Sequence, residues 1–255
     1  MRLIVLASGS SGNAAIIESG GRAVLLDAGI SARETLRRIS AATAVDARIE
    51  AILLTHEHVD HVRGARVLAR NLGIPIIGTT GTLQALATTL TDVPDTATIT
   101  RRDHLSLAGM RITSFPTAHD AAESCGYSFE SRRGHRIAIT TDTGVVTPEA
   151  LEALTGAHVI GIEANHDPRM LDAGPYPPFL KRRIAGSNGH LSNEAAAQAL
   201  RSVVWSGLSQ VFALHISEQN NTPETVRETL AETLAKQGTI TLETVARGEI
   251  AGCTL

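Results

Sequence analysis

The chain has 255 residues, which is long enough for one α/β domain with a large buried core. Hydrophobic residues make up 43% of it and charged residues 19%, so the composition is that of a globular protein and excludes an intrinsically disordered chain. A formal net charge of −3 excludes a basic surface over the whole molecule, and an aromatic content of 3% excludes a long stacking platform for single strands.

Cysteine usage and hydropathy indicate the compartment. The two cysteines do not form a CxxC pair, which fits a reducing interior, and no apolar run is long enough to span a membrane. The apolar start of the chain is short and is expected to form a first strand rather than a signal peptide. We therefore expect a cytoplasmic protein with no membrane partner.

The first half of the chain alternates short apolar runs with glycine-rich breaks, which predicts strands at residues 2–7, 14–18, 22–27 and 51–54. Ser31 and Glu34 form a capping box, so a helix is expected to begin there and to run to about Ile39. Further helices are predicted at about 60–71 and 83–90, with a strand at 75–78 between them.

The second half is richer in strands, which are predicted near Thr98 and at residues 110–115, 126–130, 135–140, 158–163, 211–214 and 239–246. Thr147-Pro148 and Thr222-Pro223 each predict a helix start, and an alanine-rich helix is expected from Ser192. Residues 167–183 are interrupted by prolines and receive no assignment. Because no linker or repeat divides the chain, we expect one domain over residues 1–255. Hairpins followed by alternating strands and helices predict two sheets with helices outside, not one doubly wound sheet.

The strongest chemical motif is His56-Glu57-His58-Val59-Asp60-His61, directly after the apolar strand at 51–54. In extended backbone His56 and His58 project to the same side, so both can reach one cation. The helical zinc motif HExxH does not fit, because the position four residues after His56 is Asp60. Imidazoles and a carboxylate this close together suit zinc, manganese or iron.

Three further candidate ligands follow predicted strands. His119 comes after the strand at 110–115, Asp142 after the strand at 135–140, and His215 after the strand at 211–214. Each alone is more often a loop residue than a ligand. Together with the first motif, they are predicted to complete a metal centre.

In this ordered set of residues the chain resembles the metallo-β-lactamase superfamily over nearly its whole length. The resemblance implies an α/β fold of the αββα sandwich type, two mixed β-sheets flanked by helices, with a dinuclear centre at one edge. It implies that one metal ion is held by His56, His58 and His119. The second is then held by Asp60, His61 and His215, with Asp142 as the bridge. Asp27 matches an early aspartate of the family that supports the metal loop.

Three more segments narrow the choice of branch, although each also fits an ordinary turn or a capped helix. The segment 8–13 carries hydroxyls and an amide that could approach a phosphate group of a substrate. The segment 163–167 carries an amide and an imidazole. The segment 186–194 carries an imidazole just before a helix N-terminus, which attracts anions. The expected substrate-binding residues are Ser8, Ser10, Asn13, Asn165, His166 and Ser192. His190 is expected to protonate a leaving oxygen. These segments, with the NNTPE sequence after His215, resemble the YycJ/WalJ-type branch, which implies a DNA 5′-to-3′ exonuclease linked in some members to mismatch repair.

We therefore expect a dinuclear metal-dependent phosphodiesterase with a nucleic-acid substrate, DNA rather than RNA, and repair proteins as partners. The ligand set predicts attack by a metal-bridging hydroxide on phosphorus, with Asp60 and Asp142 orienting it and Asp60 taking its proton. Two divalent ions are expected, zinc or manganese, with iron also compatible. The basic run Lys181-Arg182-Arg183, with Arg169 nearby, fits either a guide for a strand or a solvated turn.

Three alternatives stay open at this stage. The same fold and metals would also suit an RNA-processing or small cyclic-nucleotide phosphodiesterase, or hydrolysis of a thioester, lactone or lactam. A non-catalytic metal-stabilised scaffold would lack one or more ligands, whereas this sequence has the full set. Oligomeric state does not follow from the sequence.

Overall fold

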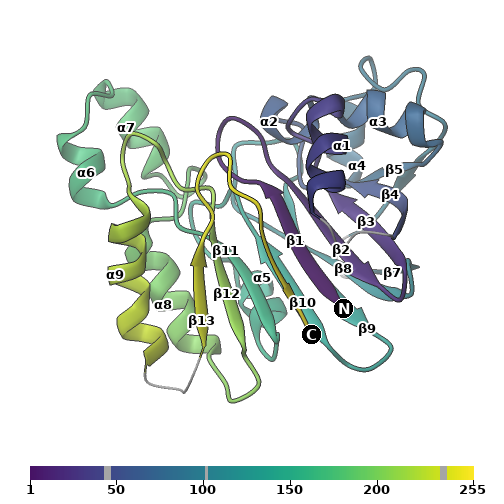
Figure 1. Cartoon of the computed structure of the whole chain (residues 1–255). Coiled ribbons are helices and arrows are strands. Elements are labelled where there is room, and N and C mark those ends of the chain that lie inside the picture. Colours follow the sequence, from purple (N-terminus) through teal and green to yellow (C-terminus); the bar gives the residue numbers. More distant parts are fainter. Residues whose placement is uncertain (43–46, 101–102, 236–239) are drawn as a thin grey trace.

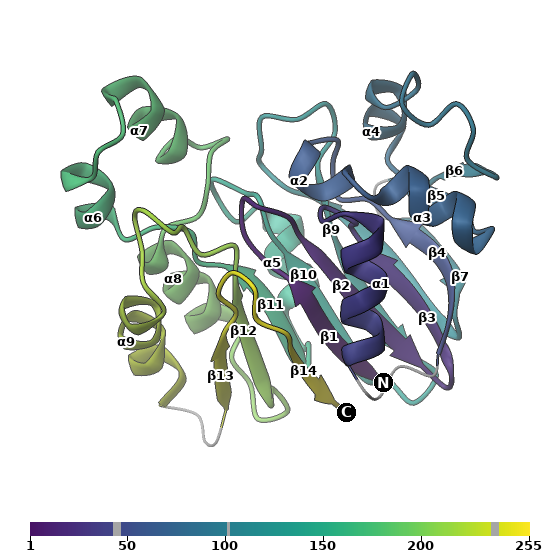
Figure 2. The same cartoon turned by 45° about the horizontal axis from the view of Figure 1, so that its top comes forward.

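The structure, a computed structural model, describes residues 1–42, 47–100, 103–235 and 240–255. Over these residues two seven-stranded sheets face each other, and helices cover their outer faces (Figures 1 and 2). The predicted αββα sandwich with two mixed sheets is therefore confirmed. None of the helices in the described ranges has the length and apolar character that crossing a membrane needs.

The first sheet is built from the N-terminal strands and the last strand of the chain. Its order is β14 (Ala251–Thr254), β1 (Arg2–Ala7), β2 (Ala14–Ser19), β3 (Arg22–Leu26), β4 (Arg48–Leu53), β5 (Ile76–Gly78) and β6 (Thr96–Thr98). Neighbours are antiparallel from β14 to β3 and parallel from β3 to β6. The parallel half ends at the edge where the His56 motif follows β4.

The second sheet is built from the middle and the C-terminal part of the chain. Its order is β13 (Thr241–Thr244), β12 (Gln210–Leu214), β11 (Val159–Glu163), β10 (Arg136–Thr140), β9 (Cys125–Ser131), β8 (Met110–Pro116) and β7 (His104–Leu107). Strands β10 to β13 are parallel to one another, so their carboxyl ends meet at one edge. Ligands in such sheets bind outside the carboxyl ends of the strands.

Nine helical segments are described in these ranges: α1 (Ala32–Ala41), α2 (Val59–Val62), α3 (Ala65–Leu72), α4 (Thr80–Ala85), α5 (Pro148–Leu154), α6 (Pro168–Ala173), α7 (Pro178–Ile184), α8 (Asn193–Val203) and α9 (Pro223–Leu234). The expected caps are present, because the side chains of Ser31, Thr147 and Thr222 accept hydrogen bonds from the first turns of α1, α5 and α9.

The core has three layers because the strands are buried on both faces. Leu3 and Val5 of β1 point into the cluster between the sheets, which also contains Tyr127 and Phe129. Their neighbours on β1, such as Leu6, point the other way into a cluster under α1 and α3. A third cluster packs α5, α8 and α9 on the second sheet. Both sheets are thus held firmly up to the edge that carries the site.

Several predicted elements differ from the structure. The single helix expected at 60–71 is divided into α2 and α3 at Gly64, where a Cβ would lie 2.4 Å from the carbonyl oxygen of Ile30. The helix expected at 83–90 begins earlier, because Thr79 caps α4. Strands β7 and β14 were not expected, and they exist through pairing with β8 and β1. Position 239, where the last strand was expected to start, lies outside the described residues.

Candidate metal centre and active site

The candidate site lies at the edge where strands from both sheets end. His56 follows β4, Asp142 follows β10 and His215 follows β12. Asp27, Asp142 and His215 have φ angles of 56°, 51° and 53°, in the left-handed region that non-glycine residues rarely adopt. Such backbone costs about 1–3 kcal/mol per residue and persists where surrounding structure holds it, typically at functional sites.

Asp27 anchors the metal-binding loop from below. Its carboxylate accepts hydrogen bonds from the backbone N–H and the hydroxyl of Thr55, and it lies 2.7 Å from Nδ1 of His61. The backbone of Asn13 and Gly29 completes this anchor, since Asn13 N–H donates to the carbonyl oxygen of Asp60. The His61 ring is therefore fixed with Nε2 directed toward Asp142, at 3.1 Å from its carboxylate.

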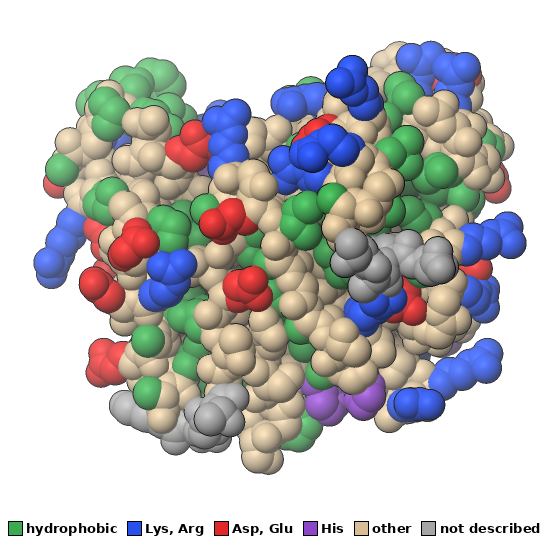
Figure 3. All heavy atoms as spheres, viewed as in Figure 1, with side chains coloured by type: hydrophobic (Ala, Val, Ile, Leu, Met, Phe, Trp, Pro, Cys, Tyr) green, Lys and Arg blue, Asp and Glu red, His purple; other side chains and the backbone are tan. Residues whose placement is uncertain are grey.

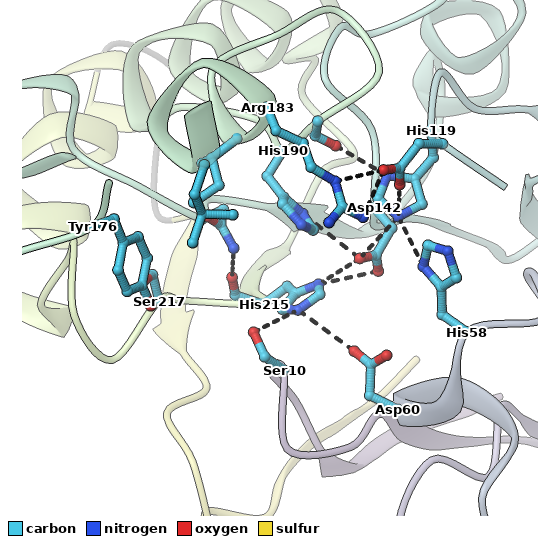
Figure 4. Close-up of a pocket in the computed structure, with 15 residues that line it drawn as sticks. Ser10, His58, Asp60, His119, Asp142, Tyr176, Arg183, His190, His215 and Ser217 are labelled. Atoms are coloured by element: carbon cyan, nitrogen blue, oxygen red, sulfur yellow. Dashed lines mark hydrogen bonds and ion pairs between the residues drawn. The ribbon is translucent and has the colours of Figure 1, made fainter. Parts of the chain in front are cut away.

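His56, His58 and His119 form the first group of converging imidazoles. Nε2 of His119 lies 3.3 Å from Nδ1 of His58, and one nitrogen of each ring lies within 4.8 Å of the others. The backbone carbonyl of Gly189 accepts a hydrogen bond from Nδ1 of His119, which orients that ring. The predicted first ligand set is thus brought together by the fold, and Figure 4 shows two of its members, His58 and His119.

Asp142 lies at the centre of the remaining groups. Its carboxylate is 2.9 Å from Nδ1 of His215, 3.6 Å from Nδ1 of His190 and 4.0 Å from Nε2 of His119. Asp142 is 2% exposed, so these charges interact with little screening by water. A residue in this position contacts both sides of the centre, as a bridging ligand must.

Asp60 sits nearer the solvent than the other carboxylates. Its side chain is 20% exposed, and its carboxylate lies 3.6 Å from Nε2 of His61 and 4.0 Å from Nε2 of His215. Ser10 approaches the same nitrogen of His215, at 3.4 Å. The predicted second set of Asp60, His61 and His215 is therefore close together.

The groups of converging donor atoms differ from the predicted ligand sets in three respects. The groups within 4.8 Å of one another are His56, His58 and His119; His56, His61 and Asp142; and Asp142, Glu163, His190 and His215. His215 groups with Asp142 rather than with His61, and Glu163 joins the set although it was not predicted. Asp60 belongs to none of these groups.

Glu163 is the functional residue that the sequence reading missed. It is the last residue of β11 and is fully buried. One carboxylate oxygen lies 2.7 Å from Nδ1 of His190, and the other accepts a hydrogen bond from the backbone N–H of Thr143. The available signal was its position at the carboxyl end of an apolar strand, near the places where Asp142 and His215 follow their strands.

The donor set fits divalent metal ions. Nε2 of His56 is buried and has no hydrogen-bond partner among the described residues, which is costly unless something else accepts its lone pair or proton. Burial lowers the pKa of His56 well below its ordinary value, and the nearby His61 ring lowers it further. Burial also lowers the pKa of His119. Neutral imidazoles of this kind offer a free lone pair to a cation.

Neighbouring carboxylates and imidazoles in the centre shift one another's pKa values toward the charged forms. Burial alone would raise the pKa of Asp142, but the rings of His215 and His61 hold it well below its ordinary value. Burial alone would lower the pKa of His61, but the carboxylates of Asp142 and Asp27 raise it well above. For His190, burial lowers the pKa, but the carboxylates of Glu163, Asp142 and Asp60, with Glu163 contributing most, outweigh this effect and raise the pKa to about 9.

A cavity of about 250 Å³ opens above these side chains (Figure 4). Its lining includes His58, Asp60, Asp142, His190 and His215, together with residues of the α6–α7 segment. The predicted substrate-binding residues Ser10 and Asn165 also line it, and the amide of Asn165 donates to the carbonyl oxygen of His215.

The side chains of Ser8, Asn13 and Ser192 have hydrogen-bond partners inside the protein, whereas the buried Nδ1 of His166 has none among the described residues. The Ser8 hydroxyl accepts a hydrogen bond from His215 N–H, and the Asn13 amide lies 3.0 Å from Nε2 of His61. Ser192 caps α8 by accepting from Ala195 N–H. His166 is 3% exposed and pairs through its backbone with Ser192. These four residues support the site, and none of them is among the lining residues of the cavity.

An αββα sandwich with histidines and carboxylates gathered at the shared edge of its sheets defines a class of metal-binding hydrolase. Residues 22–216 match the family described as "Beta-lactamase superfamily domain", and every predicted ligand lies inside this span. The chain belongs to this superfamily.

Two relatives place the chain more finely. It is 34% identical over 236 residues to exodeoxyribonuclease YycJ from Bacillus anthracis, which covers 92% of this chain and 89% of the relative. It is 32% identical over 236 residues to exodeoxyribonuclease WalJ from Streptococcus pneumoniae, which covers 91% of this chain and 87% of the relative. The chain therefore belongs to the YycJ/WalJ branch, as its motifs indicated.

A solved structure supports the fold. The metallo-beta-lactamase fold protein YhfI from Bacillus subtilis matches with a TM-score of 0.74 at 16% identity, covering 99% of this chain and 100% of that one. At this identity the likeness concerns the fold alone.

Proposed function

We propose that this protein is a metal-dependent phosphodiesterase that removes nucleotides from a DNA strand in the 5′-to-3′ direction. The observation that carries the proposal is the cavity in which buried metal-ligand candidates lie beside the His190–Glu163 pair. The names of the two relatives, both exodeoxyribonucleases, support DNA as the substrate. We also propose a role in DNA repair, a cytoplasmic location and repair proteins as partners.

Two divalent ions, zinc or manganese, are proposed as cofactors, and iron suits the same ligands. His56, His58 and His119 would hold one ion, Asp60, His61 and His215 the other, and Asp142 would contact both. When bound, such ions act as Lewis acids that stabilise negative charge on phosphoryl oxygens and lower the pKa of water.

The chain's own groups then divide the work of proton transfer. Asp60, partly exposed at the cavity, orients the attacking water and accepts its proton. His190 lines the cavity and donates a proton to the leaving oxygen, while its Nδ1–H is held by the carboxylate of Glu163. Glu163 is a positioning residue, since it fixes the tautomer and the orientation of the His190 ring.

The test replaces Asp60 by Asn. The Asp60→Asn variant should lose activity on end-labelled single-stranded DNA by about a thousandfold, because the general base is removed. The melting temperature should stay within a few degrees of the parent, and Asp92→Asn, an exposed acid on another part of the surface, should keep full activity.

Digestion in Mn²⁺ and in Zn²⁺ with labelled DNA, labelled RNA and a thioester identifies the substrate class. Faster turnover of RNA or of the thioester than of DNA would overturn the proposal, as would an active Asp60→Asn enzyme.

A further inference from the structure

The segment of α6 and α7, residues 168–184, projects beside the cavity and is called the arm below (Figures 1 and 2). Leu171 is the buried residue of α6, and α7 buries none of its residues. A short helix gains most of its stability from packing an apolar face, and α7 has no such face in the core. Its residues are therefore free to serve a surface function.

The arm has an unusual share of the aromatic residues. The chain has four phenylalanines, two tyrosines and one tryptophan, and the arm contains Phe179 and Tyr176. The other phenylalanines are between 0% and 4% exposed, whereas Phe179 is 67% exposed. Phe179 therefore presents an aromatic ring at the surface, and covering such a ring releases hydrophobic free energy.

The arm is also positively charged in an acidic chain. It has four basic residues, Arg169, Lys181, Arg182 and Arg183, against one acidic residue, Asp172, while the chain as a whole has a net charge of −3. Arg169 and Arg182 are exposed and make no ion pair within the ranges that the structure describes. Figure 3 shows hydrophobic side chains over the α6–α7 region and Lys or Arg side chains along the hollowed upper edge beside it. The partner that fits is therefore an anion with flat apolar faces.

The two sides of α7 connect this surface to the site. Leu180, Arg183 and Ile184, spaced by three and four residues, line the cavity. Phe179 and Arg182, also three residues apart, do not line it and are exposed. The Arg183 guanidinium lies 2.6 Å from the Asp120 carboxylate, and the carbonyl of Ile184 accepts a hydrogen bond from His190 N–H. The cavity-facing side of α7 thus adjoins His190, and Phe179 and Arg182 lie on the other side of the same short helix.

We propose that the arm binds the unpaired end of a DNA strand, with the Phe179 ring stacked on a base and Arg182 paired with a phosphate. The proposal rests on the proposed function and specifies its substrate as a strand whose terminal nucleotides are unpaired. Stacking on an aromatic ring is available to every base, and arginine pairs with phosphate in a bidentate manner. The cavity of about 250 Å³ is slightly smaller than most ligand sites, which favours one unpaired nucleotide over a base pair.

The experiment measures binding by fluorescence anisotropy, with the metal-loaded enzyme and phosphorothioate oligonucleotides that resist cleavage. Phe179→Ala should weaken binding of a single strand about tenfold and weaken binding of a blunt duplex much less, because within a duplex only the outer faces of the terminal pairs are not already stacked. Arg182→Ala should weaken binding and reduce the slope of log affinity against log salt by about 0.7. Leu72→Ala and Arg201→Ala, exposed positions on α3 and α8, are the matched controls and should change neither.

Hydrolysis of bis(p-nitrophenyl) phosphate separates the two proposals. Phe179 and Arg182 do not line the cavity in which this small diester is cleaved, so Phe179→Ala and Arg182→Ala should hydrolyse it at the parent rate. If the parent enzyme cleaves neither the small diester nor DNA, the proposed function fails. If the parent cleaves both and the arm variants bind single strands as tightly as the parent, the inference about the arm fails. Equal losses on single strand and blunt duplex would also overturn it, because they exclude stacking on unpaired bases.

Discussion

Two regions border the cavity and differ in how they are held. Asp142 and His215 at the strand ends are 2% and 1% exposed, and each has backbone in the left-handed region. In the arm, α7 has no buried residue and Phe179 is 67% exposed. The packing of both sheets holds the strand-end residues in place from several sides. The arm, in contrast, is attached through α6 and through the ion pair of Arg183 with Asp120.

This difference matches the work that each region is proposed to do. Metal ions and proton transfer need groups fixed to within about 0.5 Å, which buried strand ends provide. A polymer of any sequence needs a surface that tolerates different bases, which an exposed ring and flexible arginine side chains provide. Substitutions in the first region should therefore change kcat or the fold, and substitutions in the second should change substrate affinity.

After Asp60→Asn, the largest effect on the reaction is expected from Glu163→Gln. The carboxylate holds Nδ1–H of His190 with one oxygen and the N–H of Thr143 with the other, and an amide presents its NH₂ group to one of these donors. His190 is then misoriented or in the wrong tautomer, and kcat on DNA should fall about a hundredfold. The KM for DNA should be unchanged, since Glu163→Gln does not alter a residue of the arm.

The matched comparison is His190→Gln, alone and combined with Glu163→Gln. The two losses should not add, because both substitutions remove the same proton donor. Metal content, measured by elemental analysis, should equal that of the parent. A loss of bound metal in Glu163→Gln would show instead that Glu163 is a ligand, and the positioning role would then be wrong.

Glu163 also shows where prediction from sequence stops. Strands, caps and the His56 motif are local patterns, and they led to the correct sandwich. The meaning of Glu163 depends on β11 lying in parallel register between β10 and β12, with Glu163 opposite Leu214. That neighbourhood brings His190 to Glu163 from a distant part of the chain.

Other failures have the same cause. β7 and β14 are short strands that exist because they pair with β8 and β1. The hydroxyl of Ser8 looked available for a phosphate, but the fold brings it to the backbone of His215, more than two hundred residues away. The arm could not be assigned, because its prolines break the apolar periodicity and its helices bury almost nothing.

A smaller effect on activity, with a larger one on stability, is expected from Gly29→Ala. A Cβ at Gly29 would lie 1.5 Å from the carbonyl oxygen of Asp60, so helix α2 must move and carry the Asp60 carboxylate with it. Overpacking of this kind costs about 3 kcal/mol, and the melting temperature should fall by roughly 10 °C. The control is Gly78→Ala, where the nearest atoms lie 3.5–3.6 Å from the new Cβ and little change is expected. Equal melting temperatures for the two variants would contradict the close approach of these loops.

The smallest expected effect is that of Ser192→Ala, at the border of the two regions. The Ser192 hydroxyl accepts a hydrogen bond from Ala195 N–H and caps α8, as the Thr222 hydroxyl caps α9 by accepting from Thr225 N–H. Loss of a cap costs about 1 kcal/mol, so Ser192→Ala and Thr222→Ala should each lower the melting temperature by about 2–4 °C. KM and kcat on DNA should stay at parent values in both, because the structure gives the Ser192 hydroxyl a partner within its own helix. A raised KM in Ser192→Ala alone would mean that this serine also contacts the substrate, as its position before a helix N-terminus first indicated.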